Sequence, residues 1–152
     1  MILDVPGRGR SELSQLLLDL NGTLSARGEL LPGVGDRLAG LRPTLSVHLL
    51  SADTFGTLGR VAEKLGVRAE TVATGAEKAA YADRLGAERC VAVGNGANDV
   101  PMLERVALAI VVIGPEGAAG AAVRAADVVC ASILDALDLL ADERALVATL
   151  RR

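Results

Sequence analysis

A run of three leucines that ends in an aspartate constrains the fold of this chain more than any other stretch. Residues 16–23 read Leu-Leu-Leu-Asp-Leu-Asn-Gly-Thr. An uninterrupted apolar run is typical of a strand buried on both faces of a parallel sheet. Open α/β sheets bind ligands just beyond the carboxyl ends of their strands, so Asp19 is expected where a ligand would lie. Asp-x-Asn-Gly is also ordinary turn chemistry, and this stretch alone leaves turn and active site as equal interpretations.

The composition favours a single domain, residues 1–152, with an aliphatic core. Hydrophobic residues make up 51% of the chain but aromatic residues only 1%, so Leu, Val, Ile and Ala must fill the interior. Base stacking needs aromatic side chains, and phosphate backbones need a basic surface. The aromatic shortage and the net charge of −3 therefore argue against nucleic acid as a partner.

Three features bear on where the protein works and how it assembles. The longest apolar run, residues 106–113, is shorter than the roughly 20 residues that a membrane span needs, and no signal-peptide pattern opens the chain. Cys90 and Cys130 lie in apolar runs, so we expect two buried free thiols in a cytoplasmic protein without membrane contact. The mean hydropathy of +0.38 favours a homo-oligomer that hides apolar surface.

Strand-like and helix-like segments alternate along the chain. We expect strands at 1–5 (as a short edge strand), 13–20, 45–50, 67–72, 90–93, 108–113 and 127–129. We expect helices at 33–41, 55–65, 76–85, from about 101, at 118–126 and in the C-terminal tail, and a hairpin or flap between residues 23 and 32. This alternation is typical of an α/β protein with a doubly wound parallel sheet in three α/β/α layers.

Three of the expected strands end in polar clusters. The clusters are Asp19/Asn21/Thr23, Ser51/Asp53/Thr54 and Asn95/Asn98/Asp99. Because the carboxyl ends of parallel strands meet at the same edge of a sheet, we expect these side chains to converge. Such a convergence favours an active site over an isolated turn.

The clusters resemble the motifs of the haloacid dehalogenase superfamily of phosphohydrolases and phosphotransferases. Residues 19–25, Asp-Leu-Asn-Gly-Thr-Leu-Ser, are similar to the nucleophile motif, and residues 50–54 to the second motif. Residues 94–103, Gly-Asn-Gly-Ala-Asn-Asp-Val-Pro-Met-Leu, resemble the metal motif Gly-Asp-Gly-x-Asn-Asp-x-Pro-x-Leu, and Lys78 fits the family lysine. The phosphorylation domain of P-type ATPases and its small soluble relatives have the most similar pattern. The resemblance covers about residues 13–113 and implies a Rossmann-like fold without a cap domain.

The resemblance also implies a role for each matched residue. Asp19 would be the nucleophile that forms an aspartyl-phosphate, which divides a difficult hydrolysis into two easier steps. Mg²⁺ would be the cofactor, bound by oxygen atoms of Asp19, Asn95 and Asp99, by the backbone carbonyl of Asn21 and by the phosphate. Lys78 would neutralise charge on the nucleophile and on the phosphoryl group. The remaining phosphate-binding groups would come from Gly22, Thr23, Ser51 and Ala52.

Two asparagines depart from the superfamily's pattern. Asn21 stands where its phosphatases have an aspartate that exchanges a proton, a service typically worth about 10²–10⁴-fold in rate. Asn95 replaces the first aspartate of the metal motif, so Mg²⁺ affinity should fall. Two interpretations remain: a slow phosphohydrolase with a phosphorylated substrate of unspecified identity, or a non-catalytic phosphate-binding or regulatory module.

Other residues have plain structural interpretations beside a functional one. Lys78 would be a solvated helix residue if the resemblance did not hold. His48, the only histidine, is expected in the core with its hydrogen bonds satisfied. Arg8 and Arg10 are expected to be solvated charges, with a partner surface as the alternative. Residues 114–117, Gly-Pro-Glu-Gly, are expected to form only a turn.

Overall fold

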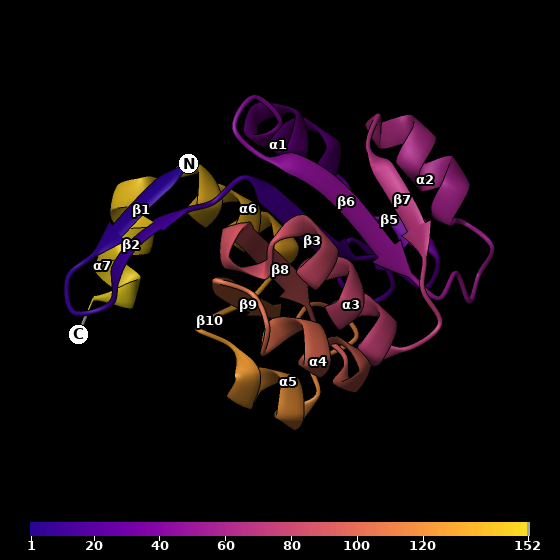
Figure 1. The fold of residues 1–152 in the computed structure, drawn as a ribbon. Helices are drawn as coiled ribbons and strands as arrows, with labels where there is room; N and C mark the ends of the chain where they lie inside the picture. The colour runs from indigo at the N-terminus through magenta and orange to yellow at the C-terminus, as the bar shows by residue number, and fades with distance from the viewer. Residues whose placement is uncertain (152) are drawn as a thin grey trace.

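The computed structural model describes residues 1–151. Its largest element is a six-stranded parallel sheet with the strand order β10-β9-β8-β3-β6-β7 (Figure 1). The strands are β3 (Gln15–Asp19), β6 (Ser46–Ser51), β7 (Arg68–Thr71), β8 (Cys90–Gly94), β9 (Leu108–Val112) and β10 (Val128–Cys130). The chain builds outward from β3 through β6 to β7 and then restarts at β8 on the other side of β3. The expected doubly wound sheet is confirmed, and β3 lies at its topological switch point.

Helices cover both faces of the sheet, which confirms the three-layer expectation. One face packs against α1 (Val34–Leu41), α2 (Leu58–Leu65) and α6 (Ile133–Ala141). The other packs against α3 (Gly75–Leu85), α4 (Val100–Leu103) and α5 (Gly120–Ala125). In Figure 1, α1 and α2 lie above the sheet, and α3, α4 and α5 lie in front of it and below.

The three leucines of β3 serve both cores. Successive strand residues point to opposite faces, so Leu16 and Leu18 join the core under α1, α2 and α6 while Leu17 joins the other core. All three are 0% exposed. Burial of one such side chain stabilises a fold by about 1.5–3 kcal/mol, and an uninterrupted apolar run is therefore required at this position.

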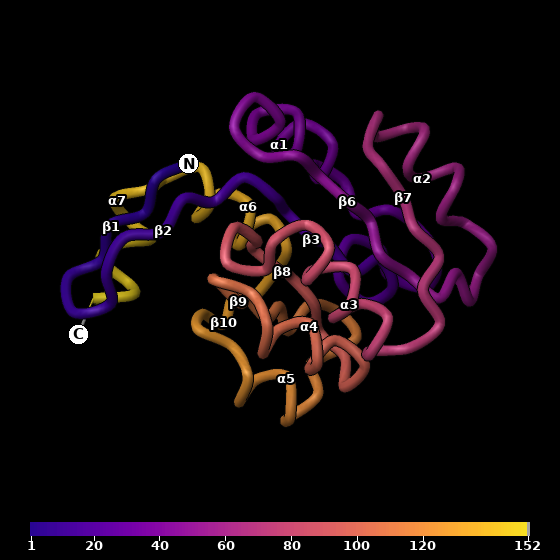
Figure 2. The backbone as a smooth tube through the Cα atoms, in the orientation of Figure 1, coloured from indigo at the N-terminus to yellow at the C-terminus, as the bar shows by residue number. Residues whose placement is uncertain are grey.

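The first residues of the chain form a hairpin outside the main sheet, contrary to the expectation of an edge strand. In this hairpin β1 (Ile2–Val5) pairs antiparallel with β2 (Gly9–Glu12). The last helix, α7 (Glu143–Leu150), packs on β1, and Figure 2 shows both termini at this end of the molecule. The sequence of β2, Gly-Arg-Ser-Glu, has no apolar alternation, so it predicts no strand.

The flap expected between residues 23 and 32 is confirmed. It is a small antiparallel hairpin of β4 (Ser25–Ala26) and β5 (Glu29–Leu30) that directly follows the end of β3. Between this flap and β6 the structure has α1 alone, so within residues 1–151 no cap domain separates the first two motifs.

Three local boundaries differ from the expected ones. Helix α2 begins at Leu58 instead of Phe55, because the Asp53 carboxylate accepts a hydrogen bond from the Leu58 N–H and Gly56 adopts a φ of 63° before it. Short 3₁₀ turns, η1 (Ala87–Arg89) and η2 (Ala97–Asp99), precede β8 and α4. The helical tail divides into α6 and α7 at Asp142, whose side chain caps α7. No helix within residues 1–151 has the length and apolar character needed to cross a bilayer.

Candidate active site

The chain turns sharply after Asp19 and places Thr23 beside it. The carbonyl oxygen of Leu20 accepts hydrogen bonds from the N–H of Leu24 at 3.0 Å and of Ser25 at 2.9 Å, which folds the segment into a tight loop. The Thr23 hydroxyl then donates to Asp19 Oδ2 at 3.2 Å. Asp-Leu-Asn-Gly is therefore a turn, and the turn builds the site.

Lys78 joins two aspartates in a buried ion-pair triad. From α3 its Nζ reaches Asp19 Oδ1 and Asp99 Oδ1, each at 2.6 Å. Asp19 is 5% exposed, Lys78 1% and Asp99 0%. The interpretation of Lys78 as a solvated helix residue is wrong. A buried ammonium between two carboxylates is expected to hold their relative positions firmly, because removing the ammonium would leave two buried negative charges without a cation.

Both carboxylate oxygens of Asp99 already accept hydrogen bonds. Its Oδ1 accepts from Lys78, and its Oδ2 accepts from the backbone N–H of Asn95 at 3.0 Å and of Gly96 at 2.9 Å. Gly94 must be glycine here, since a Cβ would lie 2.5 Å from Asp99 Oδ2. In this arrangement Asp99 fixes Lys78 to the loop after β8.

The triad carries one uncompensated negative charge, because two carboxylates face one ammonium. Burial raises the pKa of Asp19 to about 6, and the neighbouring Asp99 adds to the rise, although Lys78 and Thr23 oppose it. For Lys78, burial alone would lower the pKa, but the charges of Asp19 and Asp99 outweigh it and raise the pKa above its usual value. The site therefore favours an additional cation.

Asn21 and Ser51 meet on the β6 side of the site. Asn21 Nδ2 donates to Ser51 Oγ at 3.3 Å, and Ser51 Oγ also accepts from the Asp53 N–H at 3.0 Å. Asn21 Oδ1 is buried and has no hydrogen-bond partner among residues 1–151. Ala52, beside Ser51, is exposed. The pair thus offers an amide, a hydroxyl and a free acceptor oxygen on one side of Asp19.

Asn95 faces Asp19 from the β8 side. Its Oδ1 lies 3.3 Å from the Thr23 hydroxyl, and its Nδ2 donates to the Gly117 carbonyl oxygen at 3.0 Å. Gly22, with a φ of 81°, lies against this amide, and a Cβ there would come within 2.5 Å of Asn95 Nδ2. Glycine at this position satisfies both the backbone conformation and the close approach.

The structure brings together most of the polar residues that end the three strands, and it sets three of them aside. Asp53 caps α2 through the Leu58 N–H at 2.8 Å, and Thr54 and Asn98 are exposed. Glu116, which sequence reasoning assigned to a plain turn, contacts the flap: its Oε1 accepts from the Arg27 N–H at 2.8 Å. The sequence contained a signal for Glu116, because this residue follows the expected strand 108–113, observed as β9. The carboxyl end of β9 lies at the same edge of the sheet as the ends of β3, β6 and β8.

The other candidate residues have structural roles. His48 is 1% exposed; its Nδ1 lies 3.0 Å from the Tyr81 hydroxyl, its Nε2 lies 2.9 Å from Gln15 Oε1, and burial lowers its pKa. It is a core histidine as expected. Arg8 is exposed, as expected of a solvated charge, but it also pairs with Asp127 at 2.7 Å and so links the hairpin to the sheet.

The two cysteines and the second arginine of the hairpin also match their expectations. Cys90 and Cys130 are buried free thiols. Arg10 is a surface charge that lies 3.9 Å from Glu12.

The residues around Asp19 fit a hard divalent cation. Such ions prefer oxygen ligands, and the Asp19 carboxylate, Asn21 Oδ1 and Asn95 Oδ1 are oxygens of this kind. Buried polar atoms normally have a partner, and Asn21 Oδ1 has none among residues 1–151, so this oxygen is free to bind a cation. The uncompensated negative charge of the triad is a second reason to expect a bound cation. Of these three candidate ligands only Asp19 is a carboxylate. Within residues 1–151 no group of three His, Cys, Asp or Glu is arranged for metal binding.

Comparison with solved structures defines the class of protein. The 3-deoxy-D-manno-octulosonate 8-phosphate phosphatase of Moraxella catarrhalis, solved with magnesium, phosphate and KDO, matches with a TM-score of 0.68 and 16% identity over 90% of this chain and 92% of that one. Apo phosphoserine phosphatase matches with a TM-score of 0.70 and 16% identity over 85% and 98% of the two chains. The catalytic domain of the CPx-ATPase CopB matches with a TM-score of 0.61 and 17% identity over 74% of this chain and 46% of that one. The chain has the haloacid dehalogenase fold, shared with phosphatases and with a P-type ATPase domain.

A sequence relative identifies the narrower family. The uncharacterized protein MJ0073 of Methanocaldococcus jannaschii is 45% identical over 64 residues, which are 42% of this chain and 69% of that protein. The chain belongs to the same family as this archaeal protein. No family model matches the sequence.

Proposed function

We propose that this protein is a slow, Mg²⁺-dependent phosphohydrolase that acts through an aspartyl-phosphate on Asp19. The observation that carries the proposal is the buried Asp19–Lys78–Asp99 triad at the carboxyl end of β3. A carboxylate held there by a lysine, with a neighbouring threonine and serine, provides a nucleophile and the groups that bind a phosphoryl oxygen. The cobalt and magnesium ions bound in structurally similar phosphatases support a divalent metal.

In the first step, an Asp19 oxygen attacks phosphorus and the bond from phosphorus to the leaving oxygen breaks. Lys78 already contacts Asp19 Oδ1, so its charge offsets the negative charge that accumulates on the phosphoryl oxygens. The hydroxyls of Thr23 and Ser51, the Gly22 segment and the exposed Ala52 segment would hold those oxygens. In the second step water attacks phosphorus, inorganic phosphate leaves, and Asp19 is again a carboxylate.

Proton transfer is the weak part of this mechanism. The leaving oxygen must gain a proton in the first step, and the attacking water must lose one in the second. Asn21 can donate a hydrogen bond but cannot exchange a proton, so both transfers fall to solvent water. We therefore propose slow turnover and a relatively long-lived aspartyl-phosphate.

A divalent cation bound by Asp19, Asn21 and Asn95 would neutralise phosphate charge and orient the phosphoryl group. Asp99 has both oxygens engaged, so in this proposal it positions Lys78 and the loop after β8 in preference to binding the metal. Asn95 would be a neutral ligand, and metal affinity should be modest.

A non-catalytic phosphate-binding or regulatory module is the second candidate. The observation that favours it is that Asn21 and Asn95 stand where the superfamily's motifs have carboxylates, around an intact Asp19–Lys78–Asp99 triad. Such a module would bind a phosphorylated ligand through Lys78, Thr23 and Ser51 without turnover. A phosphorylated substrate and a cytoplasmic location remain predictions from the sequence.

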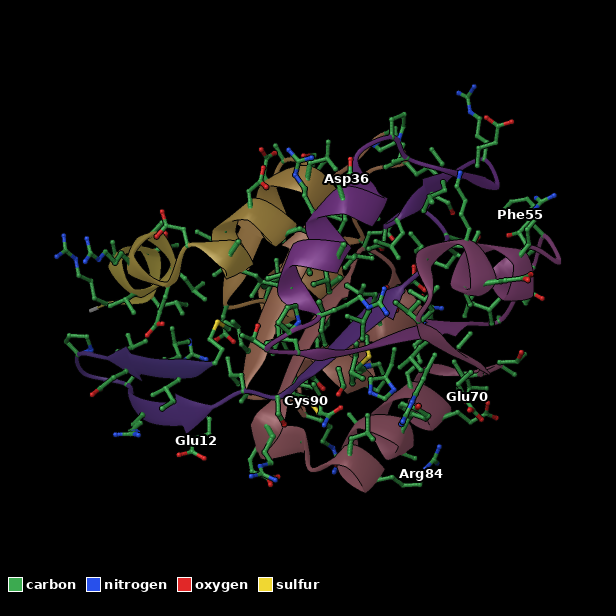
Figure 3. The ribbon with its side chains drawn as sticks, turned by 90° about the horizontal axis from the view of Figure 1, so that it is seen from above. Glu12, Asp36, Phe55, Glu70, Arg84 and Cys90 are labelled. Atoms are coloured by element: carbon green, nitrogen blue, oxygen red, sulfur yellow. The ribbon has the colours of Figure 1, made fainter. Side chains whose placement is uncertain are left out.

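Beryllium fluoride with Mg²⁺ tests the proposed nucleophile. It mimics a phosphoryl group bound to an aspartate, and a ligand that binds only the folded state raises thermal stability. We expect a rise in Tm for the wild type and none for Asp19→Asn, which keeps the shape of the side chain but not the carboxylate. Asp36→Asn, an exposed change on α1 (Figure 3), is the matched control and should respond like the wild type. An absent shift, or the same shift in Asp19→Asn, would refute the aspartyl-phosphate.

A further inference from the structure

The loop that follows β9 carries a carboxylate to the edge of the candidate site. Glu116 lies in this loop, and β9 is the neighbour of β8 in the sheet. Two hydrogen bonds join the loop to the end of β8: Asn95 Nδ2 donates to the Gly117 carbonyl oxygen at 3.0 Å, and the Ala119 N–H donates to the Asn95 carbonyl oxygen at 2.8 Å. The position of Glu116 is therefore tied to that of Asn95.

The two oxygens of Glu116 have different surroundings. Oε1 accepts from the Arg27 N–H at 2.8 Å, which attaches the loop to the flap. Oε2 lies 3.0 Å from the position that a Cβ on Gly22 would occupy, and the Glu116 side chain is exposed. Asn95 Nδ2 lies 2.5 Å from the same point. Glu116 and Asn95 thus meet over Gly22, one residue away from Asn21.

The contacts of Thr23 link Asn95 to one particular oxygen of Asp19. The Thr23 hydroxyl is 3.2 Å from Asp19 Oδ2 and 3.3 Å from Asn95 Oδ1. Lys78 occupies the other oxygen, Oδ1. Glu116 therefore adds negative charge beside Asn95, the amide that Thr23 links to Asp19 Oδ2. The partnerless Asn21 Oδ1 is the other acceptor next to Gly22.

We propose that Glu116 supplies the anionic charge that Asn95 does not provide, so that a divalent cation beside Asp19 is held partly by Glu116. This inference rests on the proposed function, because it concerns the same cation. The affinity of oxygen-ligand sites depends on the number of charged ligands, and this site contains two neutral amides. A carboxylate from a neighbouring strand end restores the missing charge without a change in Asn95.

A purely structural role is the competing explanation for Glu116. The hydrogen bond to Arg27 would then be its whole purpose, and Phe55, which packs on Gly28 of the flap, would share the task of holding the flap. A glutamine at position 116 separates the two explanations. Its amide oxygen still accepts from the Arg27 N–H, but its side chain carries no charge.

The test is a titration of the full chain with Mn²⁺, followed by electron paramagnetic resonance of the free ion, with Mg²⁺ competition. We expect Glu116→Gln to weaken Mn²⁺ and Mg²⁺ binding by about tenfold. Glu12→Gln, on the hairpin beyond the opposite end of β3, removes an equal charge and should leave the affinity unchanged (Figure 3). In an Asn95→Asp background the loss caused by Glu116→Gln should be smaller, because both changes act on one charge.

The outcomes separate this inference from the proposed function. If the wild type binds the ion in a way that Asp19→Asn abolishes, but Glu116→Gln binds equally well, the role of Glu116 is refuted and the proposed function stands. If the wild type binds no ion, both are refuted. Hydrogen exchange of the Arg27 amide provides the check on folding: Glu116→Gln should keep its protection and Glu116→Ala should lose it. A weaker affinity in Glu116→Gln accompanied by loss of that protection would support the structural role and overturn the proposal.

Discussion

Lys78 Nζ lies 2.6 Å from Asp19 Oδ1, and the two side chains are only 1% and 7% exposed. The same nitrogen is equally close to Asp99 Oδ1. One ammonium thus serves two buried carboxylates, and the remaining negative charge affects both the stability of the fold and the chemistry of the site. Four predictions follow from the triad, from the asparagines beside it and from the edge of the sheet.

Asp19→Asn should stabilise the metal-free protein at neutral pH. Asp19 has its pKa raised from 3.8 to about 6, so the folded state prefers the protonated form. The stability that this group contributes is fully present below about pH 3.8 and is lost as pH rises through about 6. An asparagine at position 19 does not ionise, so the protein does not lose this stability as pH rises, and Lys78 then pairs with Asp99 alone.

We expect the gain to be about 1–3 kcal/mol above pH 7, a rise in Tm of several degrees, and to vanish near pH 4. Thermal melts of both proteins across this pH range, in a chelator, are the measurement. Asp36→Asn is the control and should show no such pH-dependent difference. A lower Tm for Asp19→Asn at pH 7.5 would contradict the argument.

Lys78→Met should destabilise the fold strongly. Methionine fills a similar volume but leaves Asp19 and Asp99 facing each other without a cation, and breaking a buried pair in this way typically costs about 3–5 kcal/mol. The loss should shrink as pH falls, because protonation removes the repulsion. Guanidinium denaturation gives the midpoints. Lys64→Met is a matched control, since Lys64 is the only other lysine and is exposed on α2; equal midpoints for the two variants would show that the triad adds nothing.

Asn21→Asp should accelerate phosphate hydrolysis if the rest of the machinery is intact. A carboxylate in this position can protonate the leaving oxygen and then activate water, and we expect at least about a tenfold rise in kcat, or about 1.4 kcal/mol off the barrier. The effect should appear mainly in kcat, because the proton moves in the transition state. An aryl phosphate with Mg²⁺ is the assay.

The added carboxylate also repels the phosphate, so the same change should be combined with Asn95→Asp. This second substitution adds a charged metal ligand and should lower the Mg²⁺ concentration needed for activity. If the folded double variant hydrolyses neither aryl nor acyl phosphates, the catalytic geometry is absent and the phosphate-binding module becomes the better interpretation.

The high apolar fraction still predicts a homo-oligomer, and the edge strand β7 offers a surface for it. All four residues of β7 are exposed, and the strand pairs on one side only, with β6. Unpaired edge groups favour addition of another strand. Antiparallel pairing of two copies about Ala69 would place Arg68 opposite Glu70 of the partner subunit, twice by symmetry.

Light scattering at micromolar concentration should therefore return about twice 15.6 kDa. Glu70→Arg should shift the protein towards the monomer, because like charges would then face each other. Arg68→Glu combined with Glu70→Arg should restore the dimer. A monomeric wild type would remove this prediction, and a dimer that Glu70→Arg leaves intact would point to another surface.

Local sequence patterns determined most of the architecture. The leucines of β3 are apolar without interruption because both faces of that strand are buried, and the alternation of strands and helices then defines a doubly wound sheet. The polar residues that follow β3, β6 and β8 were predicted to converge for a topological reason: parallel strands end at one edge. These inferences need only the order of elements along the chain.

Tertiary structure alone decided how the charges pair and which loops close the site. Nothing in the periodicity of α3 separates Lys78 from a solvated lysine; its burial follows from the packing of α3 beside β3 and β8. The hairpin partner β2 has no apolar pattern, and Glu116 lies in a stretch that reads as a plain turn. Each of these positions is determined by contacts between residues far apart in the chain. Such contacts depend on three-dimensional packing, which cannot be inferred from a short stretch of sequence.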